Sequence, residues 1–140
     1  SGMATPPAVH SSEDWISKVV TEYFSSQEQG DCQQFVSLFN ETFSITDPND
    51  SPAVTDIADV MAGCKGTQQA FSKVVLTPLN IYVAGNGAAV QWNCASVFKN
   101  GCKLNFSGVD SFQLDPTSLG IARVIGFFNV SIPAHQCPQR

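Results

Sequence analysis

The sequence predicts an α+β domain with helices packed on one face of an antiparallel sheet. Apolar residues recur at helical spacing in the first part of the chain, and the second part carries four β-like runs separated by turn signals. Helices followed by a meander of strands are typical of the α+β class. A length of 140 residues, 43% of them hydrophobic and 14% charged, suits one folded domain with an apolar interior.

Two helices are expected at the start. Ser11 can cap an amphipathic helix over 13–29, whose apolar residues fall on one stripe, and Gly30 ends it. Asp31 offers a second cap, which is followed by a short helix with apolar side chains at 35–39.

The middle of the chain is predicted to form a strand and two brief helices. Alternating residues at 43–46 predict a short strand that ends at Asp47. A helix over 54–62 stopped by Gly63, and another over 68–75, are expected to follow.

The second part of the chain predicts the meander. Asn100-Gly101 is the strongest short-range signal for a hairpin. The expected strands occupy 79–84, 88–98, 103–114 and 121–130.

Composition also limits the partners and the location. Residues 1–12 are expected to form a disordered tag and arm, 13–132 the single domain and 133–140 a tail. A net charge of −5 argues against a nucleic-acid partner, and no apolar run approaches the roughly 20 residues that cross a bilayer. No secretory signal opens the chain, so a cytoplasmic location is expected.

The cysteines and histidines predict neither disulfides nor a metal site. Five cysteines are an odd number and include no C-x-x-C pair, which favours reduced, mostly buried thiols and argues against zinc. His10 and His135 lie near the two ends and are expected on the surface. The five cysteines are Cys32, Cys64, Cys94, Cys102 and Cys137.

Three polar residues stand where apolar ones are expected. Tyr23 lies on the apolar stripe of the first helix, and Asp47 ends the short strand. Period two places Asp110 on one strand face with Phe106 and Phe112, where burial would raise the pKa of its carboxyl. Each residue alone also fits a structural role, as a core tyrosine, a turn residue and a solvent-facing charge.

Together the three residues resemble a known family. The chain is similar to bacterial delta-5-3-ketosteroid isomerases over about residues 15–130. The segments that carry the resemblance are Tyr23-Phe24, Gly30-Asp31, Phe35 to Phe39, Ile45 to Pro48, Asn100-Gly101, Gly108 to Phe112 and Val124 to Phe128.

The resemblance implies a fold and an activity. The fold would be the cone of the nuclear-transport-factor-2-like (SnoaL-like) superfamily, with helices on a strongly curved sheet around one deep pocket. Asp47 would be the general base, and Tyr23 with protonated Asp110 would form the oxyanion hole, facing Asp47 across the pocket. The substrate would be a 3-ketosteroid or a similar apolar unsaturated ketone, with no cofactor or metal, and the protein would be a homodimer that uses the outer sheet face.

The same resemblance suggests a pocket wall and two departures. The candidate wall residues are Phe106, Phe112, Val124 and Phe128. The segment 49–65 is longer than in those isomerases and is expected to edge the mouth of the pocket. Asn93 replaces a residue that is usually apolar in the wall.

Two other functions fit the same residues. A polyketide-cyclase-like enzyme would use the same aspartate as a base in a pocket of different shape. A non-catalytic module for small-molecule binding or dimerisation would need no such base, because a fold does not imply a function.

Overall fold

The computed structural model describes residues 9–138, so the expected arm over 1–8 lies outside the described part. The arm's last expected residues are helical, because the first helix begins at Val9. In chain order the elements are α1 (Val9–Gln29), α2 (Cys32–Ser37), β1 (Phe39–Thr46), α3 (Ile57–Ala70), β2 (Phe71–Lys73), β3 (Leu76–Ala84), β4 (Gly87–Phe98), β5 (Lys103–Leu114), β6 (Ile121–Phe127) and α4 (Ser131–Gln136).

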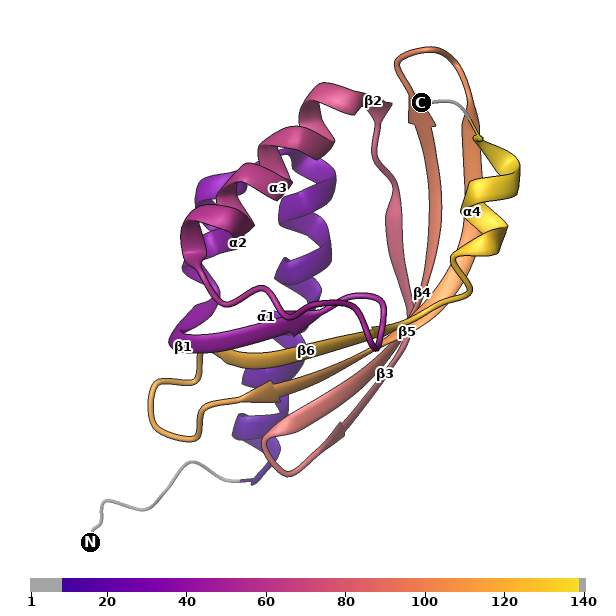
Figure 1. Cartoon of the computed structure of the whole chain (residues 1–140). Helices are drawn as coiled ribbons and strands as arrows, with labels where there is room; N and C mark the ends of the chain where they lie inside the picture. The colour runs from indigo at the N-terminus through magenta and orange to yellow at the C-terminus, as the bar shows by residue number, and fades with distance from the viewer. Residues whose placement is uncertain (1–8, 139–140) are drawn as a thin grey trace, which may run out of the picture.

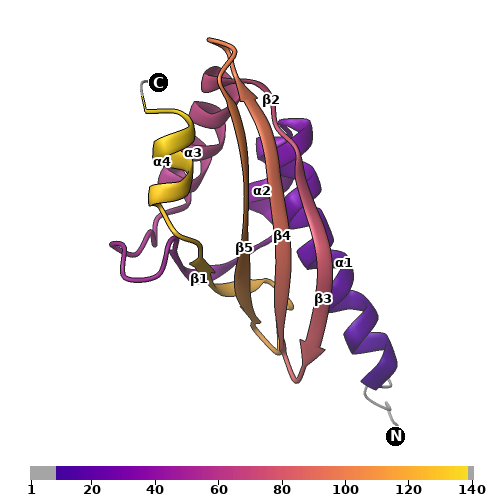
Figure 2. The same ribbon diagram turned by 90° about the vertical axis from the view of Figure 1, so that its right-hand side faces the viewer.

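The helices and the sheet form layers around one core. Helices α1, α2 and α3 cover one face of a strongly curved sheet, and α4 packs on the other face against β5 (Figures 1 and 2). This arrangement confirms the predicted α+β class with helices first and a meander afterwards. No helix within residues 9–138 is long and apolar enough to cross a membrane.

The sheet is mixed, which corrects the expectation of a purely antiparallel one. The strand order is β1-β6-β5-β4-β2, and β3 also pairs with β4. Strand β1 runs parallel to β6, whereas the other pairs are antiparallel. The β1–β6 contact joins strands far apart in the chain, so no local turn signal could predict its direction.

The first two helices form where the sequence predicts them. Gly30 adopts the left-handed conformation (φ 72°) after α1, a backbone shape that glycine tolerates without strain. Asp31 caps α2 by accepting a hydrogen bond of 3.0 Å from the Gln34 amide. Phe39 starts β1 instead of ending the helix. On α1 the residues that face the core are Ile16, Val19, Val20, Tyr23 and Phe24.

One helix replaces the two that were expected between 54 and 75. Gly63 lies inside α3 and does not end it, because a glycine in a helix costs only about 1 kcal/mol. The helix ends at Ala70 because Phe71 enters the sheet, where its ring stacks on Phe98 at a centroid distance of 4.1 Å. Strands β2 and β3 then pair with successive parts of β4, both in the antiparallel direction.

The C-terminal end contains a helix where a tail was expected. Strand β6 ends at Phe127, three residues before the expected end of the strand, and α4 at 131–136 takes the place of the first part of the tail. The Gln136 side chain pairs with the backbone of Asn105 in both directions, at 2.8 and 2.7 Å. Those bonds hold α4 against β5.

Two disulfides overturn the expectation of reduced cysteines. Cys32 at the start of α2 is bonded to Cys64 in α3, and Cys102 is bonded to Cys137 beyond α4. Cys94 is a buried free thiol. An odd count and the absence of short motifs say nothing about which cysteines meet in space. Because disulfides persist mainly in oxidising compartments, the cysteines no longer support a cytoplasmic location.

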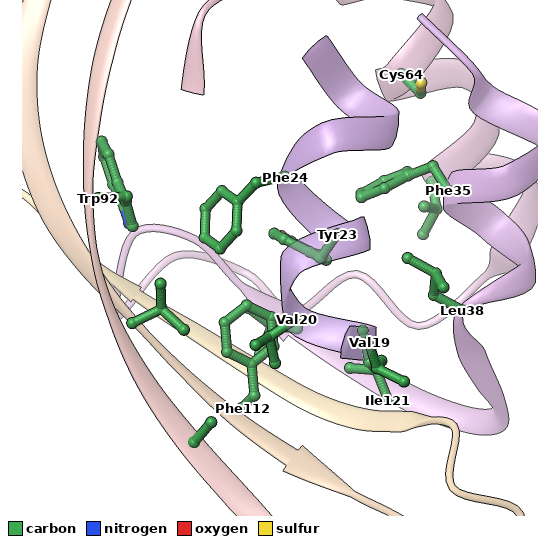
Figure 3. Packing of buried hydrophobic residues seen from close by; sticks show 14 of the residues in the cluster. Val19, Val20, Tyr23, Phe24, Phe35, Leu38, Cys64, Trp92, Phe112 and Ile121 are labelled. Carbon is green, nitrogen blue, oxygen red and sulfur yellow. The ribbon is translucent and has the colours of Figure 1, made fainter. Parts of the chain in front are cut away.

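The core between the helices and the sheet is rich in aromatic rings. The Tyr23 ring is central, with ring centroids of Phe24, Phe35 and Phe112 at 5.2, 5.1 and 4.9 Å (Figure 3). Such edge contacts add to the stabilisation from burial alone. They also hold Tyr23 in one place.

Reduction of the disulfides should destabilise the fold without changing its topology. Each disulfide closes a loop of more than 30 residues, and the loss of that constraint on the unfolded chain costs about 3–4 kcal/mol. Urea unfolding of the Cys32→Ser/Cys64→Ser variant should show a loss of this size. Cys94→Ala should respond to dithiothreitol as the parent does, and equal stability of the oxidised and reduced parent would contradict the pairing.

Candidate active site

A cavity of about 190 Å³ lies between α1 and the curved sheet. It contains both aspartates and the tyrosine that the sequence singled out, and most of its other walls are apolar. The lining residues are Tyr23, Phe24, Gln27, Asp47, Leu76, Trp92, Cys94, Phe106, Asp110 and Phe128.

Strand register brings the two aspartates together at Gly126. Asp110 on β5 is the partner of Gly126 on β6, and the β1–β6 pairing ends at Thr46 opposite Ile125, one residue before Asp47. A Cβ built on Gly126 would overlap Asp47 Oδ1 and lie 3.1 Å from Asp110 Oδ1. Only a residue without a side chain therefore leaves room for both carboxyl groups.

Asp110 points into the cavity, as the period-two pattern predicts. The residue is 4% exposed, and its Oδ1 has no hydrogen-bond partner. Burial, and then the nearby charge of Asp47, raise the pKa of Asp110 to about 7, whereas the Trp92 indole acts to lower it. Near neutral pH this carboxyl is therefore protonated in a large part of the molecules.

Asp47 lies at the mouth of the cavity. Its loop is closed by two hydrogen bonds between Ile45 and Val54, of 2.9 and 2.8 Å, and is tied to β6 by a 2.6 Å bond from Asn49 N to Gly126 O. The residue keeps contact with solvent, but the surrounding protein atoms still desolvate its carboxyl and raise its pKa. Asp47 thus stands beside Asp110, not opposite it across the cavity.

Tyr23 faces both carboxyl groups from α1. Burial raises the pKa of its hydroxyl well above the usual value, and the charges of Asp110 and then Asp47 raise it further. The hydroxyl therefore stays protonated and available as a hydrogen-bond donor.

Trp92 is a functional candidate that the sequence reasoning missed. Its indole Nε1 is buried in the same cavity as Asp110 Oδ1 and lies near enough to that carboxyl to lower its pKa, although neither atom makes a hydrogen bond of good geometry. A Cβ at Gly108, the residue opposite Trp92, would overlap the indole ring. The signal was present, since Gly108 shares a strand face with Asp110 and leaves room for a large neighbour.

The expected wall residues divide between the cavity and the core. Phe106 and Phe128 line the cavity and pack on Trp92 at centroid distances of 5.5 and 6.0 Å. Phe112 and Val124 are fully buried core residues outside the lining, because Phe112 lies beneath the Tyr23 ring.

Two further expectations change in the structure. Asn93 is not part of the wall, because Trp92 and Cys94 on either side of it point inward, and its side chain accepts a 2.8 Å bond from the Ser107 hydroxyl. The segment 49–65 does not line this cavity either. Among the side chains that the structure describes, residues 13–138, no group of three His, Cys, Asp or Glu residues could hold a metal ion.

A family model and several solved structures match the chain. The model described as SnoaL-like domain matches residues 20–116. No curated protein sequence matches.

Three solved structures are similar over most of their length. SalBIII, an epoxide hydrolase/cyclase-like enzyme in pyran ring formation of the polyether salinomycin, has a TM-score of 0.76 and 22% identity, covering 86% of this chain and 95% of its own. A protein from Catenulispora acidiphila with a ketosteroid isomerase-like fold has a TM-score of 0.71 and 14% identity, covering 88% of this chain and 94% of its own. RV0760c from Mycobacterium tuberculosis, in complex with estradiol-17beta-hemisuccinate, has a TM-score of 0.72 and 16% identity, covering 84% of this chain and 96% of its own. Identities this low show a shared fold alone.

Asp110 should make the protein less stable as pH rises. Its pKa is 3.8 in the unfolded chain and about 7 when folded, so its favourable contribution is complete below about pH 4 and is lost as pH rises through 7. The free energy of unfolding of Asp110→Asn, measured in urea, should therefore rise relative to that of the wild type by up to about 4 kcal/mol between pH 4 and pH 8.

The exposed Asp115 provides a control of opposite sign. Its pKa is lowered from 3.8 by the backbone amides of Ser118 and then Thr117, so the wild type should gain stability relative to Asp115→Asn as pH rises toward about 4, with a nearly constant difference from there to pH 8. A constant difference between Asp110→Asn and the wild type across this range would show that Asp110 is not buried as described.

Proposed function

Because the chain belongs to the SnoaL-like domain family, we propose that it is a cofactor-free acid–base enzyme that shifts a carbon–carbon double bond in an apolar unsaturated ketone of the 3-ketosteroid type. The observation that carries the proposal is the pair of carboxyl groups with raised pKa values beside Gly126, in an otherwise largely apolar cavity. Groups with shifted pKa values in a cavity are typical of proton transfer.

The two carboxyl groups take different roles. Asp47 reaches solvent at the mouth, loses its proton first and acts as the base that removes a proton from the carbon between ketone and alkene. The same carboxyl returns that proton to the far end of the dienolate, so the reaction is neutral overall. Asp110 keeps its proton and donates a hydrogen bond to the ketone oxygen as negative charge develops there.

Two neutral donors assist Asp110. The Tyr23 hydroxyl remains protonated beside the carboxyl pair, and the buried Trp92 indole N–H faces the Asp110 carboxyl, whose charged form it stabilises. A donor fixed in place before the reaction stabilises a developing oxyanion without reorganising. The contacts of Trp92 with Phe106 and Phe128 hold its ring in one orientation.

The second candidate function is acid–base opening of an epoxide by water or by a hydroxyl of the same molecule. The observation that favours it is the closeness of the carboxyl groups, which suits a base and an acid that act on neighbouring atoms of a small ring. SalBIII, with the same fold, is epoxide hydrolase/cyclase-like. Here Asp110 would protonate the epoxide oxygen while Asp47 activates the attacking hydroxyl.

The homodimer is part of the proposal. Val109 and Phe127 are paired on the outer face of the sheet and are 39% and 46% exposed. Tyr82 on β3 adds a further ring that is 65% exposed. Apolar side chains gathered on an open sheet face are typical of an interface, here with a second copy of the chain.

Removal of the base should abolish turnover and spare binding. Asp47→Asn keeps the shape of the side chain but cannot take a proton, so kcat for a β,γ-unsaturated 3-ketosteroid should fall by about two to four orders of magnitude. Affinity for a planar phenolic steroid, measured by calorimetry, should be unchanged or higher. Asp110→Asn, which still has a donor, should retain more activity than Asp110→Ala. Equal and small effects of the three substitutions would overturn the isomerase assignment, and epoxide turnover by the wild type would favour the second candidate.

Loss of the indole donor should lower the rate and move the pH profile. Trp92→Phe removes the N–H and keeps an aromatic ring, so kcat should fall by about 10- to 100-fold. The pH above which activity declines should rise, because the indole helps to lower the pKa of Asp110. Phe106→Leu changes the neighbouring wall without removing a hydrogen-bond donor, and the pH above which activity declines should be unchanged in this variant. An unchanged profile in Trp92→Phe would remove the indole from the mechanism.

A further inference from the structure

A second cleft of about 180 Å³ adjoins the carboxyl cavity on the other side of Tyr23. It lies between α1, β1 and α3, and Tyr23 and Gln27 belong to both linings. Figure 3 shows Tyr23 between Phe24 and Trp92 on one side and Phe35 and Cys64 on the other. The second cleft is lined by Tyr23, Gln27, Phe35, Ile45, Val54, Asp59, Val60, Gly63, Cys64 and Thr67.

The carboxyl cavity is small for the substrate class proposed above. Pockets that enclose drug-sized molecules have volumes of about 300–1,000 Å³, and this cavity has about 190 Å³. A polycyclic ketone whose oxygen lies at Asp110 must therefore extend beyond it.

The boundary between the two spaces is movable at Gln27 and fixed at Tyr23. The Tyr23 ring is held by four neighbouring phenylalanine rings. Gln27 is only half-buried, and its amide donates a 2.8 Å bond to the backbone oxygen of Tyr23. A molecule that reaches from one space into the other requires this side chain to leave that hydrogen bond and adopt another staggered rotamer.

Helix α3 leaves space on its side of the cleft. Gly63 is exposed and belongs to the cleft lining, and a Cβ there would meet no atom within 4 Å, so a larger side chain fits at this position. Cys64 also lines the cleft, and its disulfide to Cys32 fixes α3 relative to α2. The wall that α3 forms is thus held in place by a covalent bond.

The geometry points to a two-part substrate site, in which the reacting ketone lies in the carboxyl cavity and the remaining apolar rings lie in the cleft beneath α3. The occupant is one elongated apolar molecule, because the two spaces share residues and the cleft walls include Phe35, Ile45, Val54 and Val60. Asp59 at the exposed start of α3 suits a hydroxyl group at the distal end of that molecule. The inference rests on the proposed function for the placement of the ketone.

Filling the cleft should separate long ligands from short ones. Calorimetry with a planar phenolic steroid and with a one-ring phenol would compare the wild type with Gly63→Leu, whose side chain occupies the cleft. Gly63→Leu should weaken steroid binding at least tenfold and leave the one-ring phenol unchanged. Val54→Phe, from the opposite wall, should have the same effect, and thermal unfolding would verify that both variants fold.

Gly66→Leu is the matched control. Gly66 lies on the same helix, a Cβ there would also meet no atom within 4 Å, and the residue does not line the cleft. This variant should bind both phenols as the wild type does. Equal loss in Gly66→Leu and Gly63→Leu, full steroid affinity in Gly63→Leu, or no steroid binding by the wild type would each overturn the inference. Steroid binding without turnover of any ketone would instead count against the proposed function and leave the two-part site in place.

Discussion

The site depends on the register of three neighbouring strands at Gly126. Strand β6 lies between β1 and β5, so Asp47 at the end of β1 and Asp110 on β5 approach the same glycine from two sides. A side chain at this position would collide with the Asp47 carboxyl and crowd that of Asp110. The backbone pairing that builds the sheet edge therefore also brings the two carboxyl groups together, and a register shift of one residue would turn Asp110 to the opposite face.

The aromatic core gives the carboxyl pair its chemistry. Tyr23, Phe106 and Trp92 exclude water from the inner end of the cavity, and burial is the largest cause of the raised pKa of Asp110. The same burial makes that residue unfavourable for stability above its pKa. Two neighbouring carboxyl groups with raised pKa values are thus maintained by packing elsewhere in the fold.

The segment 49–65 after Asp47 does not form a rim of the carboxyl cavity, but it holds the loop of Asp47 and begins helix α3. The pair of hydrogen bonds between Ile45 and Val54 holds the Asp47 loop, and α3 beyond it forms a separate wall that is bonded to α2 through Cys32–Cys64. Loop and helix are therefore fixed independently.

Periodicity and turn chemistry determined much of this protein from its sequence. The stripe on α1, the bounds of β5 and the strand face that Asp110 shares with Phe112 follow from local spacing, because each depends on residues close together in the chain. The same spacing singled out the three polar residues, and the family resemblance suggested their roles. The tertiary structure alone decided the parallel β1–β6 pair, both disulfides, the continuous α3, the position of Asp47 beside Asp110 and the buried Trp92 indole near the Asp110 carboxyl. Those features join residues distant in the chain, and their geometry comes from packing that no local pattern encodes.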